Sequence, residues 1–109
     1  MNYPVVLDIA VHDDKDVLQS GFTVRGSLIR EPKVGGLITL SHIGGYCNRF
    51  QVKFLDIEED LRNRFLFLDC KGFFQTLQGQ SLPFTLEFEE EVLEALEKEG
   101  WHTCEVDGS

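Results

Sequence analysis

A serine and a histidine stand next to each other at Ser41 and His42, and nucleophilic catalysis pairs these residue types. We expect this part of the chain to be a strand, where neighbouring side chains point to opposite faces, so the imidazole is badly placed to deprotonate that hydroxyl. Three carboxylates at Glu58, Glu59 and Asp60 can support acid–base chemistry in a shielded cleft, but they stand in a predicted polar loop. These residues therefore predict no catalytic site.

Cysteine and histidine side chains near the C-terminal end raise the question of a metal site. His102 and Cys104 stand two apart, so on a strand they share one face, and Cys47 or Cys70 would have to complete a zinc site. Structural zinc sites use tightly paired ligands, and the sequence has a single such pair. The aspartate cluster in residues 12–16 lacks the glycine and glutamate positions of an EF-hand loop. We therefore expect no metal and no cofactor.

Established enzyme motifs are missing from the sequence. It contains no Walker A loop, no Gly-x-Gly-x-x-Gly, no His-Glu-x-x-His, no Cys-x-x-Cys and no Gly-x-Ser-x-Gly. The three cysteines are odd in number and widely spaced, which favours reduced thiols and the cytoplasm over a disulfide framework. We expect a cytoplasmic protein that is not an enzyme.

Charge is distributed unevenly along the chain. The formal net charge is −9, but residues 25–55 carry about +4 and residues 56–109 about −10. An acidic protein is a poor ligand for nucleic acid polymers, because lysine and arginine contacts to phosphates supply most of that affinity. The candidate ligand-binding residues come from the basic middle third and are Arg25, Arg30, Lys33, Ser41 and Arg49.

Two short segments of this basic region resemble the PilZ domain. Arg25-Gly-Ser-Leu-Ile-Arg30 and Thr39-Leu-Ser-His-Ile-Gly44 are similar to that family's Arg-x-x-x-Arg and Asp/Asn-x-Ser-x-x-Gly motifs. The arginines stand one residue farther apart here, and Thr39 replaces the acidic or amide residue. The resemblance implies a six-stranded barrel with a C-terminal helix. It also implies that the domain binds cyclic di-GMP through Arg25, Arg30 and Ser41, with the arginines pairing with the phosphates.

A β-hairpin is predicted at the centre of the chain. Within the strand predicted at 49–57, apolar Phe50, Val52 and Phe54 alternate with polar Gln51 and Lys53, which is typical of a strand with one buried face. Residues 65–68 are continuously apolar and predict a strand that is covered on both faces. Residues 58–63 are the polar loop between them, and Lys71-Gly72 marks a break after the second strand.

Further strands are predicted from β-branched or alternating segments at 3–11, 17–29, 73–77 (a short strand or bend), 83–88 and 101–106 (a strand or ordered tail). Gly26 marks a bulge or a close backbone contact. Residues 34–43 fit a strand or a helix, and we favour the strand because two glycines and a β-branched pair lower helix propensity. From Glu89 to Glu99 the apolar residues follow a helical period, and Gly100 ends the helix.

The sequence predicts a single α+β domain, mainly β, over residues 1–106, with a frayed tail at 107–109. We expect an antiparallel barrel or strongly bent sheet of about six to seven strands with one C-terminal helix at 89–99. A ubiquitin-like β-grasp is the alternative if residues 34–43 are helical. No apolar run reaches the ~18 to 20 residues that a membrane span needs.

These observations predict a non-catalytic, acidic interaction module, an adaptor or regulatory subunit that binds another protein through the basic patch or an exposed strand edge. The alternative is a PilZ-like sensor of an anionic nucleotide, such as cyclic di-GMP, that uses Arg25, Arg30 and Ser41.

Overall fold

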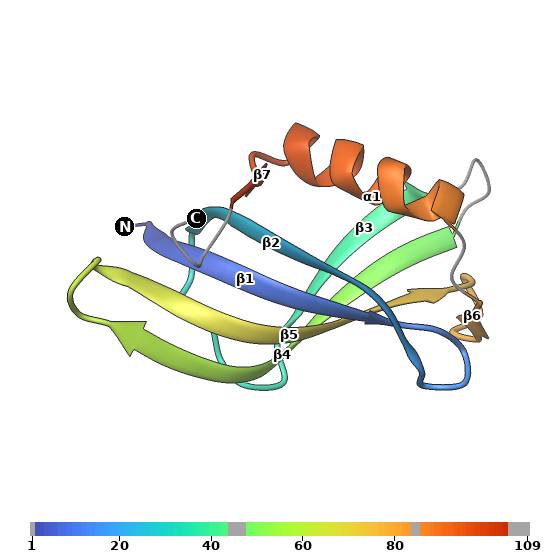
Figure 1. The fold of residues 1–109 in the computed structure, drawn as a ribbon, viewed down its shortest axis with the longest axis horizontal. Helices are drawn as coiled ribbons and strands as arrows, with labels where there is room; N and C mark the ends of the chain where they lie inside the picture. Colours follow the sequence, from blue (N-terminus) through green and yellow to red (C-terminus); the bar gives the residue numbers. More distant parts are fainter. Residues whose placement is uncertain (1, 44–47, 84–85, 105–109) are drawn as a thin grey trace.

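Seven strands form one curled sheet, and one helix packs on it (Figure 1). The structure, a computed structural model, describes residues 2–43, 48–83 and 86–104. Within them no helix is long and apolar enough to cross a membrane. The predicted mainly β class with one C-terminal helix is confirmed. The elements are β1 (Tyr3–His12), β2 (Leu18–Leu28), β3 (Leu37–Ile43), β4 (Asn48–Asp60), β5 (Phe65–Gln75), β6 (Ser81–Leu82), α1 (Leu86–Lys98) and β7 (His102–Thr103).

Two antiparallel units make up the sheet. β1 and β2 form one hairpin, and β3, β4 and β5 follow each other as a meander. The two units join where β5 pairs with β1 in parallel, from Val5 opposite Leu66 to Val11 opposite Gly72. The resulting strand order is β3-β4-β5-β1-β2-β7, and β6 pairs with the end of β5. Pairing between β1 and β5 therefore brings the N-terminal hairpin beside the middle of the chain.

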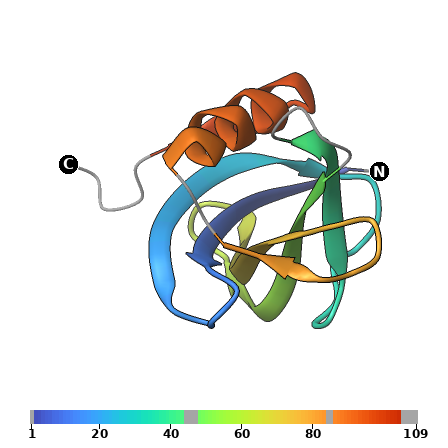
Figure 2. The same ribbon diagram turned by 90° about the vertical axis from the view of Figure 1, so that its right-hand side faces the viewer.

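The sheet curls into a half-barrel whose concave side holds the core (Figure 2). Alternate residues of β1, β2, β4 and β5 point inward, as the period of a strand requires. α1 packs against β3 and lies across the open side of the curl. The buried core residues include Leu7, Ile9, Val24, Phe50, Val52, Leu68, Phe74, Val92 and Leu96.

The helix begins earlier than predicted, and the strand predicted at 83–88 is wrong over residues 86–88. Phe88 belongs to the same helical stripe as Val92 and Leu96, because the three are spaced four residues apart. The Phe88 ring packs on Phe74 of β5, with ring centroids 4.7 Å apart. Contact with the sheet therefore favours the helix at residues 86–88, although their local sequence also fits a strand.

Two glycines act through packing rather than through turns. The predicted break at Gly72 is wrong, since β5 runs to Gln75, and a Cβ on Gly72 would lie 2.5 Å from the Phe50 ring. Gly26 makes a close contact, as one of the two predicted alternatives, because its Cβ would lie 2.5 Å from the Trp101 ring. Both positions lack a side chain because an aromatic ring fills the space.

Several predicted boundaries shift or lie outside the described residues. β4 continues to Asp60, so the hairpin turn covers residues 61–64 rather than 58–63. The strand predicted within residues 34–43 is confirmed as β3, and the helical premise of the β-grasp alternative is therefore wrong. The predicted tail at 107–109 lies outside the described part of the chain.

Candidate functional site

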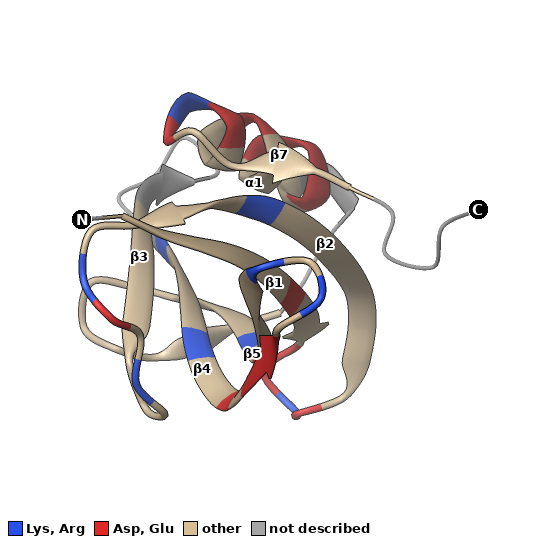
Figure 3. Ribbon diagram, turned by 90° about the vertical axis from the view of Figure 1, so that its left-hand side faces the viewer, with Lys and Arg blue, Asp and Glu red and all other residues tan. Residues whose placement is uncertain are grey.

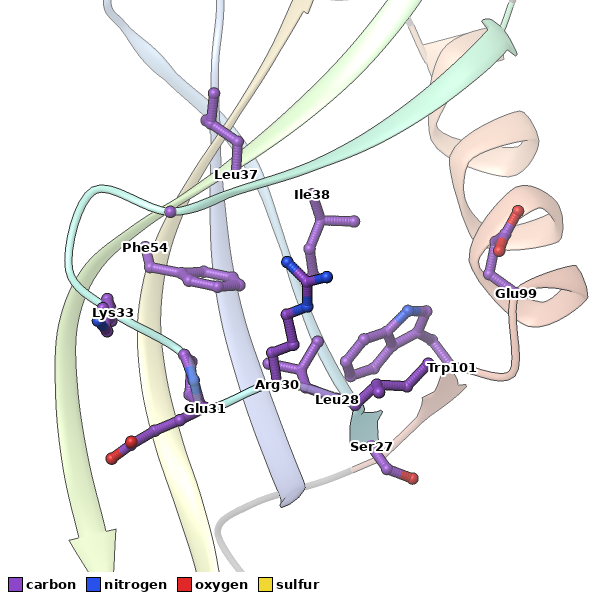
Figure 4. Close-up of a pocket in the computed structure, with 13 residues that line it drawn as sticks. Ser27, Leu28, Arg30, Glu31, Lys33, Leu37, Ile38, Phe54, Glu99 and Trp101 are labelled. Atoms are coloured by element: carbon purple, nitrogen blue, oxygen red, sulfur yellow. The ribbon is translucent and has the colours of Figure 1, made fainter. Parts of the chain in front are cut away.

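A groove lies between the end of β2 and the start of β3, beside the C-terminal end of α1 (Figure 4). The loop from Ile29 to Gly36 forms one wall of this groove. Backbone hydrogen bonds hold that loop on β4: Gly35 donates to the Phe54 carbonyl at 2.8 Å, and the Phe54 amide donates to the Gly36 carbonyl at 2.9 Å. Gly35 has φ +89°, a conformation that glycine adopts without a steric penalty. The wall is therefore fixed to the sheet.

The floor of the groove is apolar. Leu28 comes from the end of β2 and Ile38 from the start of β3, Phe54 comes from β4, and Trp101 follows the helix. Phe54 and Trp101 are buried, while Leu28 and Ile38 are partly buried and pack on the core. The volume is about 770 Å³, which lies in the range of ligand pockets. The groove is thus a shallow extension of the core toward the surface.

The end of α1 positions Trp101. The Trp101 amide donates to the Leu96 carbonyl at 2.9 Å, and the Gly100 amide donates to the Glu97 carbonyl at 3.0 Å. With Gly100 at φ +93°, these bonds form a Schellman motif, which turns the chain back across the last helical turn. The turn carries the indole ring against the sheet at Gly26. A helix cap therefore builds one side of the groove.

Arg30 supplies a cationic group within this apolar setting. Its guanidinium points into the groove between Phe54 and Trp101, whereas the carboxylates of Glu31 and Glu99 point away from its centre (Figure 4). The Arg30 side chain has no hydrogen-bond or ion-pair partner among the described residues. The guanidinium is therefore available to pair with an anionic group.

Exposed apolar side chains gather at the rim. Ile29 is 81% exposed, Val34 is 65% exposed and Leu37 is 56% exposed. Ile29 and Leu37 line the groove, and Val34 belongs to the same loop. Exposed apolar side chains therefore stand beside the apolar floor, and such groupings are often found at interaction sites.

The structure brings two of the five predicted site residues together. Arg30 and Lys33 both line the groove, with Lys33 on its outer side. Arg25 lies on β2 opposite His102 of β7 and lines a separate cavity. The basic positions on β2 and on the turn between β4 and β5 face the same end of the sheet (Figure 3). Arg25 and Arg30 therefore do not converge on one cavity.

Arg49 and Ser41 lie away from the groove. Their backbones pair in the ladder between β3 and β4, and the Ser41 side chain is outside the described part of the structure. Arg49 Nη2 donates to the carbonyls of Thr76 and Leu77 at 3.3 Å and 3.4 Å. Its Nε is buried without a partner among the described residues. Arg49 thus ties β4 to the turn that follows β5.

The side chains weighed for metal binding do not form a cluster in the described part of the chain, where no group of three or more His, Cys, Asp or Glu residues could hold an ion. Cys70 is buried, and Cys104 is partly buried and free. Burial, with smaller contributions from Asp69 and Asp8, raises the pKa of the Cys70 thiol to about 12. Cys70 therefore stays protonated and unreactive as a nucleophile near neutral pH.

Sequence reasoning missed the residues that shape the floor. Phe54 and Leu28 were assigned to strands, but nothing local shows that both strands contribute to one groove. Trp101 carried a usable signal, since a lone tryptophan directly after a helix-ending glycine often packs back on the helix end. No known protein-family model, curated protein or solved structure matches this chain.

Proposed function

We propose that this protein is a non-catalytic interaction module, an adaptor or regulatory subunit, that binds another protein through the groove. The observation that carries the proposal is the Arg30 guanidinium, unpaired among the described residues, over a floor built from Leu28, Ile38, Phe54 and Trp101. The partner segment has a large apolar side chain next to an aspartate or glutamate. The apolar side chain covers the floor, and the carboxylate pairs with Arg30.

The apolar floor supports a peptide ligand because it is already shaped. Phe54 and Trp101 are held by core packing and by the helix cap, so little conformational entropy is lost when a ligand binds. Aromatic side chains in a formed pocket contribute much of the affinity in protein interfaces. Ile29 and Leu37 are exposed in the free protein, so covering their apolar surface would contribute favourable free energy to binding.

The net charge of the protein affects how it recognises an acidic partner segment. With a net charge of −9, the protein repels an acidic partner at long range, so electrostatic steering does not favour the encounter. Arg30 is exposed in the free protein, and its pairing with a carboxylate becomes stronger than in bulk water when the bound segment excludes water from the groove. Selectivity therefore rests on the contact with Arg30.

The PilZ-like sensor remains a prediction from the sequence. It requires Arg25 and Arg30 to hold one nucleotide, but the two arginines line different cavities. Cyclic di-GMP is nevertheless a useful ligand to titrate beside the peptides, because heat release that needs both arginines would favour the sensor over the protein-binding module.

Selection from a random peptide library on the immobilised protein tests the proposal. We expect enriched peptides to carry an aromatic or aliphatic residue beside an acidic one. Arg30→Gln should weaken these peptides by about tenfold, the effect of losing one charged hydrogen bond of ~1.4 kcal/mol. Arg62→Gln is the matched control, since Arg62 is exposed on the distant β4–β5 turn, and it should leave affinity unchanged.

Three results would count against the groove. The library could yield no shared motif, or the selected peptides could bind Arg30→Gln as well as they bind the wild type. Binding of a selected peptide could also leave the fluorescence of Trp101 unchanged. The last readout is specific because the chain contains one tryptophan.

A further inference from the structure

A second cavity, of about 430 Å³, lies on the other side of the β7 segment from the groove. Trp101 lines the groove, and the next residue, His102, lines this second cavity. The other polar side chains of the lining include Arg25, Ser27 and Arg64. We call it the basic cavity, because it gathers two arginines and a histidine.

Three separate parts of the chain supply these basic residues. Arg25 comes from β2 and His102 from the β7 residue opposite it in the ladder. Arg64 comes from the turn before β5. β1 lies between them, because Val6 pairs with Arg25 on one side and Val5 pairs with Leu66 on the other. The parallel pairing of β1 with β5 therefore brings the turn to the edge of the cavity.

The charge of the basic cavity is opposite to that of the protein. No acidic side chain lines it, although the chain has 19 acidic and 10 basic residues. In the described part of the structure, the side chains of Arg25, Arg64 and His102 have no hydrogen-bond or ion-pair partner. The nearby Asp60 is engaged with Asn63, whose amide Nδ2 donates to it at 2.9 Å. The cavity therefore presents donors that nothing in its lining neutralises.

The backbone of Arg64 provides a second sign that its side chain has a use. Arg64 has φ +60°, in the left-handed region, where a glycine would fit without a steric penalty. Residues with side chains in this region cost stability, and such strain is commonly found at functional positions. The turn thus keeps an arginine where a glycine would be more stable.

We propose that the basic cavity binds the phosphate group of a small phosphate monoester. Two guanidinium groups match the planar oxygen pairs of phosphate, and the imidazole of His102 and the hydroxyl of Ser27 offer further donors. The volume accommodates a phosphate with a small organic group. This site shares Ser27 with the lining of the groove but none of its basic residues.

Calorimetric titration with inorganic phosphate and with phenyl phosphate, at constant ionic strength, tests the site. Both should bind saturably, and phenyl phosphate should bind more tightly because Phe65 and Pro4 also line the cavity. Arg25→Gln and Arg64→Gln should each weaken binding by about tenfold or more. Arg62→Gln, on the same turn but not in the lining, should bind as the wild type does.

Arg64→Gly separates binding from folding. Because glycine suits the backbone of residue 64, this variant should melt at the same temperature as the wild type or higher, yet bind phosphate at least about tenfold more weakly. The site is overturned if no saturable binding appears, if Arg64→Gly binds like the wild type, or if Arg62→Gln weakens binding equally. Arg30→Gln should leave phosphate binding unchanged, so failure here is distinct from failure of the groove.

Discussion

Trp101 is the residue on which the surface of this protein most depends. It is 6% exposed, packs on Gly26 and lines the groove, while its neighbours Gly100 and His102 line the basic cavity. Its position is set from two sides, by the Schellman motif behind it and by the β7 ladder after it. One side chain therefore links the end of the helix to the groove and to the sheet at Gly26.

Gly26→Ala should show how tightly this contact is packed. The new Cβ would lie 2.5 Å from a ring atom of Trp101, so the indole must move, at a cost of about 1–3 kcal/mol in the free energy of unfolding. Urea denaturation followed by tryptophan fluorescence measures both the loss and the change in the ring's surroundings.

Gly21→Ala is the matched control, because it lies on the same strand and its Cβ would have an ordinary contact of 3.6 Å with the Ile9 carbonyl. A Gly26→Ala protein as stable as Gly21→Ala, with unchanged fluorescence, would contradict the packing of Trp101 on β2.

Cys70 should make stability depend on alkaline pH. In the unfolded chain its thiol ionises near the ordinary pKa of 9.0, but in the folded protein burial raises the pKa to about 12. Between these values the unfolded state has released the proton and the folded state has not. The free energy of unfolding therefore falls as pH rises from 9 toward 12, and this contribution is constant below pH 9.

Comparison with Cys70→Ala isolates this effect, since the other titrating groups are common to both proteins. The wild type should lose more stability than the variant between pH 9 and 12 in urea denaturation. Parallel pH profiles for the two proteins would show that the thiol is not shielded as its burial indicates.

At the scale of elements, α1 lies across the open side of the half-barrel, and the groove lies past its C-terminal end, between the end of β2 and the start of β3. Val92 and Leu96 are buried against the sheet, and Phe88 joins them at the start of the helix. The uncovered remainder is the groove. The length of the helix thus decides that an apolar surface is left open.

Leu96→Ala should be strongly destabilising. The side chain is 1% exposed, and truncation of a buried leucine costs about 2–5 kcal/mol through lost burial and the cavity left behind. Because the Leu96 carbonyl also accepts the bond from the Trp101 amide, the fluorescence of the folded state should report any shift of the helix end.

Glu97→Ala is the control for this helix, since Glu97 is exposed and one residue away. It should change the free energy of unfolding by no more than about 0.5 kcal/mol. Equal losses in the two variants would mean that α1 is held by its own propensity rather than by packing on the sheet.

At the scale of the whole molecule, the charge of the two cavities differs from the net charge of the protein. The chain is acidic overall, yet both cavities at the β7 end contain unpaired arginines within the described structure. Most of the other lining of the groove is apolar, whereas the basic cavity gathers cationic donors. The same end of the half-barrel therefore offers two chemically different surfaces.

The sequence by itself determined the class of the fold. Alternation over residues 50–54, the apolar run at 65–68 and the helical period after Glu89 are local patterns, and each indicates its element without knowledge of distant contacts. It also placed Arg30 and Lys33 in one basic segment, and these two residues share the groove.

Only the tertiary structure decided where the helix starts, which glycines pack against rings, and which arginines share a cavity. Phe88 joins the helix because Phe74 lies beneath it, and Arg64 meets Arg25 because β5 pairs with β1. These contacts join residues far apart in sequence. Local spacing carries no information about them, because they depend on how the strands pair and how far the sheet curls.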